Sequence, residues 1–119
     1  MNLETIRCVA SILRDKNAKN IVALDVHEVC SMTDALIIAE GTVDRHVKTL
    51  AQEVVSQLAL RGLHPTFTEG ASEGDWIVLD YLDFIVHLFV PALRDKYRLE
   101  ELWGAGELIN LNVDHLASV

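Results

Sequence analysis

The chain has 119 residues, of which half are apolar and 24% are charged, and its formal net charge is −8. This length is typical of one domain, and the apolar fraction is too high for a disordered chain. No apolar run approaches the ~20 residues that a membrane-spanning helix needs, and the first residues, MNLETIRCVA, lack the apolar core of a signal peptide. We therefore expect a single cytoplasmic domain over residues 1–119.

The negative charge is concentrated in the second half of the chain. Residues 1–68 carry eight acids against seven Lys and Arg, whereas residues 69–119 carry ten acids against three. Such a half repels phosphate backbones, which argues against direct nucleic-acid binding and favours a basic protein partner. The alternative is that the excess of acidic residues only keeps a small domain soluble. The two cysteines have no metal-ligand spacing, and free thiols are expected.

The first elements can be read from apolar spacing and capping residues. Residues 3–16 place apolar side chains on one stripe of a helix, with Asn2 able to cap its start and Asn17 able to end it. The short runs 19–25 and 34–40 are rich in Ile, Val and Leu. Runs of this kind indicate two core strands.

A second helix and three more strands follow. Residues 43–62 repeat apolar positions at helical spacing, and Gly62 offers a stop. The run 63–69 favours a strand, and the segments 76–80 and 84–90 favour an antiparallel pair.

A short helical region is expected from Pro91, since proline suits a first helical turn. The resulting order, α-β-β-α-β-β-β-α, predicts an α+β fold with one mixed sheet of about five strands packed with helices. A tight hairpin between residues 80 and 84 would favour glycine at positive φ, where this chain has Leu82. We therefore expect a wider turn there.

The sequence contains little that indicates a catalytic or metal-binding site. Asp25, His27 and Glu28 follow a predicted strand, where they could act as acid, base or ligand, or simply form a solvated loop. The five histidines are too scattered for a zinc motif. We therefore expect neither a metal nor another cofactor.

The Gly41-Thr42 pair before the second helix raises the alternative of an enzyme that binds or transfers nucleotides, because a helix N-terminus can hold a phosphate. Nucleotidyl transfer also needs paired acids that carry a divalent metal. The next predicted strand, LHPTFTE at 63–69, has no such pair. Thr42 is therefore better explained as a helix cap.

The most distinctive segment is 69–104, which holds six of the seven aromatic residues. Within it, WIVLDYLDFIVHLF at 76–89 embeds Asp80, Asp83 and His87 in an apolar run. Aromatic residues bordered by charges are typical of binding hot spots. The alternative is that the aromatic side chains form the core and the acids cap turns.

The same residues resemble the Iojap family, the ribosomal silencing factors, over roughly residues 3–104, with 105–119 as a C-terminal tail. The matching positions are Thr33-Asp34, Ile37-Ile38-Ala39-Glu40-Gly41, Arg45, Glu69-Gly70, Trp76, Asp80-Tyr81, Asp83, Val86-His87-Leu88-Phe89, Arg94, Tyr97, Leu99-Glu100 and Leu102-Trp103. The chain departs from the family pattern at Ala35, where an aromatic residue is usual, and at Leu82, where glycine is usual in the turn.

The resemblance implies a protein that binds the large ribosomal subunit through the basic large-subunit protein numbered fourteen. Bound on the face of the large subunit that meets the small subunit, it would block subunit joining. Translation would then be repressed when nutrients or energy are short. It also implies a nucleotidyltransferase-like fold without the catalytic acids, and a possible homodimer. A dimeric adaptor without ribosome contact remains a further alternative. The partner-binding residues that the resemblance suggests are Trp76, Asp80, Tyr81, Asp83, His87, Arg94, Tyr97, Glu100, Leu102 and Trp103.

Overall fold

The structure, a computed structural model, describes residues 2–96 and 107–111. The elements in chain order are α1 (Leu3–Asp15), β1 (Lys19–Asp25), β2 (Ala35–Glu40), α2 (Asp44–Ala59), β3 (Phe67–Glu69), β4 (Trp76–Asp80), β5 (Phe84–Phe89), α3 (Pro91–Lys96) and β6 (Glu107–Leu108). The predicted α+β class with a mixed sheet is confirmed. The described residues form six strands rather than the expected five, because β6 adds a strand that was not predicted.

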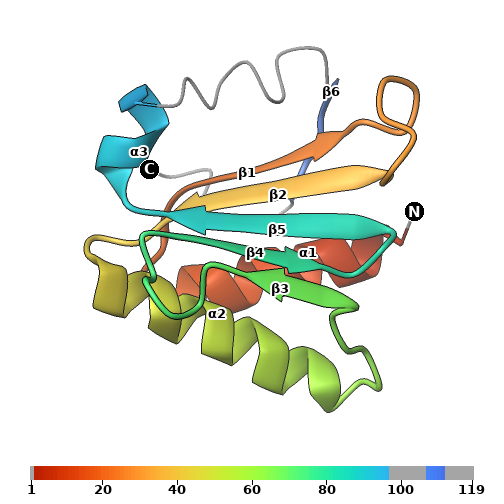
Figure 1. The fold of residues 1–119 in the computed structure, drawn as a ribbon. Coiled ribbons are helices and arrows are strands. Elements are labelled where there is room, and N and C mark those ends of the chain that lie inside the picture. Colours follow the sequence, from red (N-terminus) through yellow and green to blue (C-terminus); the bar gives the residue numbers. More distant parts are fainter. Residues whose placement is uncertain (1, 97–106, 112–119) are drawn as a thin grey trace.

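All six strands lie in one sheet, in the order β3-β4-β5-β2-β1-β6 (Figure 1). β4 and β5 are antiparallel, as predicted, and β2 and β5 are parallel neighbours at the centre. β6 pairs antiparallel with the end of β1, where Leu108 lies opposite Leu24. No helix within the described residues is long and apolar enough to cross a membrane.

Two asparagines explain where α1 begins and ends. The Asn2 side-chain oxygen accepts a hydrogen bond from the N–H of Thr5 at 3.1 Å. After the helix, Asn17 takes a φ of 65°, and the N–H of Ala18 donates to the carbonyl of Leu13. Asparagine tolerates this left-handed conformation, which closes the last turn. Both capping predictions are confirmed.

The start of α2 differs from the prediction. Its N-cap is Val43, which makes no side-chain capping bond. The Thr42 N–H donates to His46 Nδ1 at 2.9 Å, and the Thr42 hydroxyl lies 3.4 Å from the same nitrogen. Thr42 is therefore not the cap, because its hydroxyl is directed to an imidazole rather than to the N–H groups of the first helical turn.

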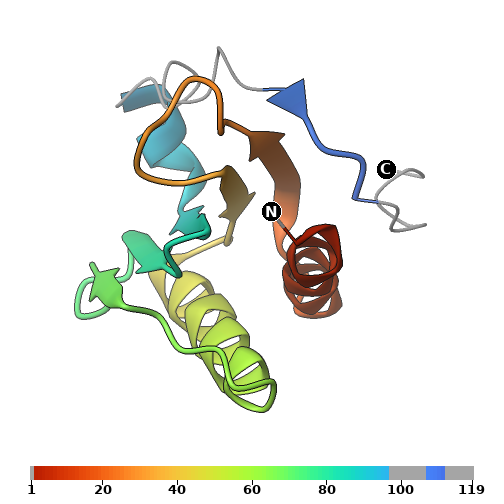
Figure 2. The same ribbon diagram turned by 90° about the vertical axis from the view of Figure 1, so that its right-hand side faces the viewer.

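The helices divide unevenly between the two faces of the sheet. α1 and α2 lie together on one side, and α3 lies on the other (Figure 2). The main core fills the space under α1 and α2, and its fully buried members include Val9, Leu13, Val47, Leu50, Val54, Ile37, Val86 and Leu88. A smaller cluster on the opposite face joins Leu24, Val26, Ile38 and Phe89, against which Leu93 of α3 and Trp76 pack.

The turn between β4 and β5 is tight. The N–H of Tyr81 donates to the carbonyl of Phe84, and the N–H of Asp83 donates back to the carbonyl of Tyr81, both at 2.9 Å. Leu82 therefore sits at the centre of a γ-turn, with a φ of 72°. The expectation of a wider turn is wrong, because the hydrogen bonds around it hold a leucine in a conformation that usually favours glycine.

Candidate functional site

Side chains of β4 and β5 share the sheet face opposite α1 and α2. Alternate residues of both strands are only partly buried, as expected where one side of a strand faces the core. The antiparallel register pairs Val78 with His87 and Asp80 with Ile85. We call this surface the β4–β5 face and define it as Trp76, Val78, Asp80, Ile85 and His87.

Trp76 and His87 are joined within this face. The indole Nε1–H donates to His87 Nδ1 at 3.2 Å, and the ring centres lie 6.1 Å apart with a 44° tilt. Burial lowers the pKa of His87 to about 4, so its imidazole is neutral at neutral pH. Because Nδ1 accepts the indole proton, the ring proton of the neutral form is assigned to Nε2.

Asp80 lies at the end of β4 on the β4–β5 face, whereas Asp83 lies beyond the tight turn and lines a pocket with Asn2, Thr5 and Tyr81 on the α1 side of the sheet. Asp80 Oδ1 accepts the N–H of Leu82 at 2.8 Å, so this partly buried carboxylate holds the turn. Asp83 is exposed, and its backbone carbonyl accepts the N–H of Asp34, the residue directly before β2. Both acids thus have structural contacts, and Asp83 also presents its charge to solvent.

Tyr81 lies apart from these residues. It is 8% exposed and belongs to the main core, where its ring stacks on Phe84 at a centroid distance of 4.9 Å. Burial raises the pKa of Tyr81 to about 12, and its hydroxyl is buried with no hydrogen-bond partner among the described residues. The structure therefore does not bring Tyr81 together with Trp76, because alternation along the strand directs it to the opposite face.

The other candidate residues follow β5. Arg94 belongs to α3. Tyr97, Glu100, Leu102 and Trp103 lie outside the described residues.

A pocket of about 430 Å³ opens beside Trp76, and its lining residues were not predicted to form one site. Its walls include Trp76, Val78 of β4 and Leu93 of α3, and three carboxylates, from Glu69, Glu73 and Asp75, line it as well. The acid-rich run EGASEGDW before β4 was the available signal. An apolar wall with several carboxylates suits a long basic side chain, whose stem can pack while its head meets the acids.

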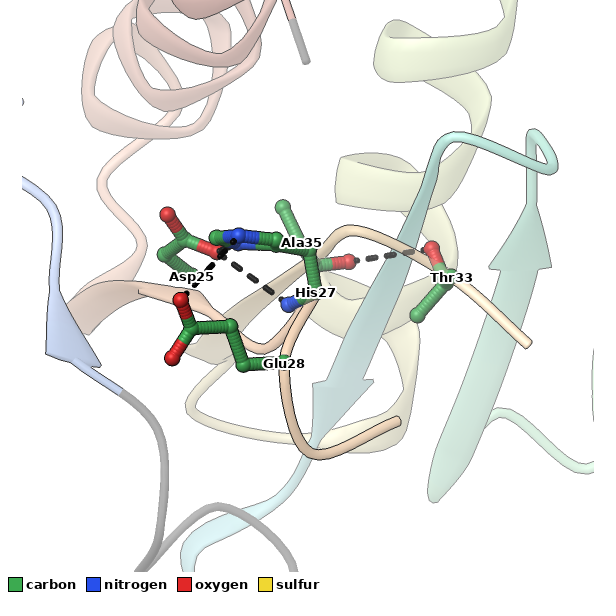
Figure 3. Close-up of polar contacts among 5 residues, drawn as sticks. All are labelled: Asp25, His27, Glu28, Thr33 and Ala35. Atoms are coloured by element: carbon green, nitrogen blue, oxygen red, sulfur yellow. Dashed lines mark hydrogen bonds and ion pairs between the residues drawn. The ribbon is translucent and has the colours of Figure 1, made fainter. Parts of the chain in front are cut away.

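The cluster at the end of β1 is a second polar site. Asp25 Oδ1 accepts the backbone N–H of His27 at 3.1 Å and contacts the His27 ring, with Glu28 alongside (Figure 3). The hydrogen bond between the two side chains raises the pKa of the His27 imidazole and lowers that of the Asp25 carboxyl. His27 and Glu28 have side chains 53% and 82% exposed. These exposures fit the solvated-loop interpretation, and no group of three possible ligands among residues 2–96 and 107–111 could hold a metal ion.

The Gly41-Thr42 loop contacts residues of α2. A Cβ atom at Gly41 would lie 2.8 Å from Val47 Cγ2 and 2.9 Å from Val47 N, so the glycine allows α2 to approach β2 closely. The Thr42 N–H is satisfied by His46 Nδ1, and His46 Nε2 lies 2.8 Å from the carbonyl of Lys16. The Thr42 N–H is thus bonded to His46, whose ring also contacts the residue that follows α1, and is not offered to a phosphate.

A family model and individual relatives of the chain point to the same family. Residues 2–118 match the family model described as "Ribosomal silencing factor during starvation". The ribosomal silencing factor RsfS of Chromobacterium violaceum is 36% identical over 101 residues, covering 85% of this chain and 83% of that protein. The RsfS of Bacillus subtilis is 34% identical over 113 residues, covering 94% and 96%. A crystal structure of a Chromobacterium violaceum protein superimposes with a TM-score of 0.82 at 34% identity, covering 95% of this chain and 94% of that one.

Proposed function

The chain belongs to the family of ribosomal silencing factors, and from this we propose that it binds the large ribosomal subunit through its basic protein fourteen. Bound there, it prevents joining with the small subunit by occupying the joining face. Translation is thereby repressed when nutrients or energy are limiting. The proposal makes the protein a binding factor rather than an enzyme.

The observation that carries this proposal is the position of Trp76 on the β4–β5 face beside a pocket with three carboxylates. Large aromatic side chains dominate the energy of many protein interfaces, and complementary charge steers and orients the partner. The ten acids and three bases of residues 69–119 add a long-range attraction for a basic protein. Asp80 adds a further carboxylate to the β4–β5 face, and the exposed Asp83 adds one beyond the turn.

Sedimentation with isolated ribosomal subunits tests the proposal. We expect the protein to sediment with the large subunit alone and to lower the yield of joined ribosomes in a subunit-joining assay. Binding should weaken as salt is raised, because charges in water are screened over about 10 Å at 0.1 M ionic strength. Equal binding to both subunits would overturn the proposal.

A charge-reversal variant provides a local control. Glu73→Lys changes a carboxylate of the pocket beside Trp76, whereas Glu28→Lys changes an exposed carboxylate at the end of β1. The same net charge results in both variants. Glu73→Lys should weaken binding to the large subunit more than Glu28→Lys does, and equal losses would show that only total charge matters.

We propose further that the fold lacks catalytic function. A nucleotidyltransferase-like fold without the catalytic acids agrees with β3, which follows α2 and supplies one carboxylate, Glu69, where metal-dependent transfer requires a pair. A cytoplasmic location is part of the proposal, and the family resemblance adds a possible homodimer. Incubation with Mg²⁺ and labelled nucleotides should give no transfer product, and a Mg²⁺-dependent product abolished by Gly41→Val would contradict this part.

A further inference from the structure

His87 is partly buried on the proposed binding face. Val78 of β4 and Ile38 of β2 flank it as its partners in the two neighbouring strands. Its Nδ1 is directed sideways along the sheet to the Trp76 indole, and not outward. A partly buried histidine whose Nδ1 is already occupied contacts the tryptophan that the partner would meet.

We propose that His87 is a positioning residue, which fixes the Trp76 indole for docking through the Nε1–H to Nδ1 hydrogen bond and does not itself contact the partner. The inference rests on the proposed function. It assigns the contact to Trp76 and the control of ring orientation to His87.

The register of the hairpin makes this arrangement possible. Val78 pairs with His87 and Trp76 pairs with Phe89, so Trp76 and His87 are diagonal neighbours on one face. Diagonal neighbours are too far apart for short side chains, but an imidazole and an indole can span the gap. Phe89 is fully buried beside them, so the indole is packed along one side and hydrogen-bonded at its nitrogen.

Fixing the ring has a predictable consequence for affinity. An interface side chain that must be immobilised on binding loses free energy equivalent to roughly twofold to tenfold in the dissociation constant. An indole that is already held avoids this loss. Release of Trp76 should therefore weaken binding by a factor in this range, which is smaller than the effect of removing the indole.

Two substitutions of nearly equal shape separate positioning from packing. In His87→Asn, the amide oxygen takes the place of Nδ1 and can accept the indole N–H. His87→Leu has a methyl group at the same place and no acceptor. The indole N–H signal of Trp76, assigned with Trp76→Phe, should be retained in the Asn variant. In the Leu variant it should shift and exchange faster with water.

Binding to the large subunit then shows whether His87 acts through Trp76. His87→Leu should weaken binding roughly twofold to tenfold, and His87→Asn should restore most of the loss. In a Trp76→Phe background, His87→Leu should have no further effect, because the phenyl ring has no N–H to hold. An equal loss in both backgrounds would show that His87 contacts the partner directly and would overturn the proposal.

The indole measurement keeps this proposal distinct from the proposed function. If the protein does not bind the large subunit at all, the proposed function fails, while the hydrogen bond is still tested by the N–H signal. If binding occurs but His87→Leu leaves the indole signal unchanged, the positioning role fails and the proposed function stands. Thermal unfolding of each variant identifies any loss that comes from misfolding.

Discussion

A Cβ atom at Gly70 would lie 1.9 Å from the carbonyl oxygen of Trp76. Gly70 also takes a φ of 85°, and its carbonyl accepts the N–H of Gly74 at 2.9 Å. The loop between β3 and β4 therefore folds back against the first residue of β4. The backbone that carries Trp76 into the β4–β5 face is shaped by a glycine six positions earlier.

Gly70→Ala should lower the free energy of unfolding more than Gly62→Ala does. Gly62 also has a positive φ, of 79°, but a Cβ there meets no atom within 4 Å. The control variant, Gly62→Ala, should therefore lose roughly 1–2 kcal/mol of unfolding free energy because alanine is forced into the left-handed conformation. Gly70→Ala should lose roughly a further 1–3 kcal/mol because of the clash. Urea unfolding of both variants measures the difference, and equal losses would contradict the close approach.

Leu82→Gly should stabilise the protein. Leu82 is 60% exposed and has a φ of 72°, so the substitution relieves backbone strain and removes little packing. We expect a gain of about 1 kcal/mol, the lower end of the left-handed penalty, because glycine also adds freedom to the unfolded chain. Leu82→Ala removes the same side chain and keeps the strain, so its melting temperature should not rise. A rise with alanine as well would assign the gain to the lost side chain.

The free energy of unfolding should depend on pH through His87. Its pKa is 6.5 in the unfolded chain and about 4 in the folded protein. Between these pH values the unfolded chain binds more protons than the folded protein does. The contribution of neutral His87 to the free energy of unfolding is therefore fully present above pH 6.5 and is lost as the pH falls toward 4. The loss should be roughly 3 kcal/mol, at 1.36 kcal/mol per pKa unit.

Urea unfolding between pH 7 and pH 4, in steps of about half a unit, tests this dependence. Carboxylates also titrate in the range, so the comparison is with His87→Asn, which cannot titrate. The stability advantage of wild type over the variant should shrink as the pH falls. Parallel curves would contradict the lowered pKa of His87.

Asp80 should affect both folding and binding, and two variants separate these effects. Asp80→Asn keeps an oxygen that can accept the Leu82 N–H and removes the charge, so the free energy of unfolding should change little. Asp80→Lys removes the acceptor as well and should lose about 1 kcal/mol. Large-subunit binding should weaken in both, and more with lysine because it repels a basic partner. Wild-type binding by a folded Asp80→Lys variant would remove Asp80 from the proposed interface.

The fold was predictable wherever local signals and the core agreed. Asn2 and Asn17 mark the start and the end of α1 as expected, because the hydrogen bonds that close each end lie within a few residues. β6 was missed because Glu107 and Leu108 form a strand only by pairing with the end of β1, more than 80 positions earlier. Two residues carry no periodicity from which such pairing can be read.

The site was only partly predictable, and the reason is the turn at Leu82. A wide turn leaves the register of β4 against β5 undefined, so the contact between Trp76 and His87 could not be derived from the sequence. The tight γ-turn fixes that register and with it the diagonal pair. The same register directs Tyr81 into the core, which the composition of the segment could not indicate.

The parallel pairing of β2 with β5 has a consequence for how the chain folds during synthesis. Ala35 pairs with Phe84, so the two strands meet across 84 − 35 = 49 positions, and α2, β3 and β4 lie between them. At about 5–20 residues per second, a ribosome takes roughly 2–10 seconds to make this stretch. During that time the β2 edge that β5 will occupy is unpaired, and such an edge invites aggregation. Slowing synthesis between β2 and β5 should therefore lower the yield of native protein.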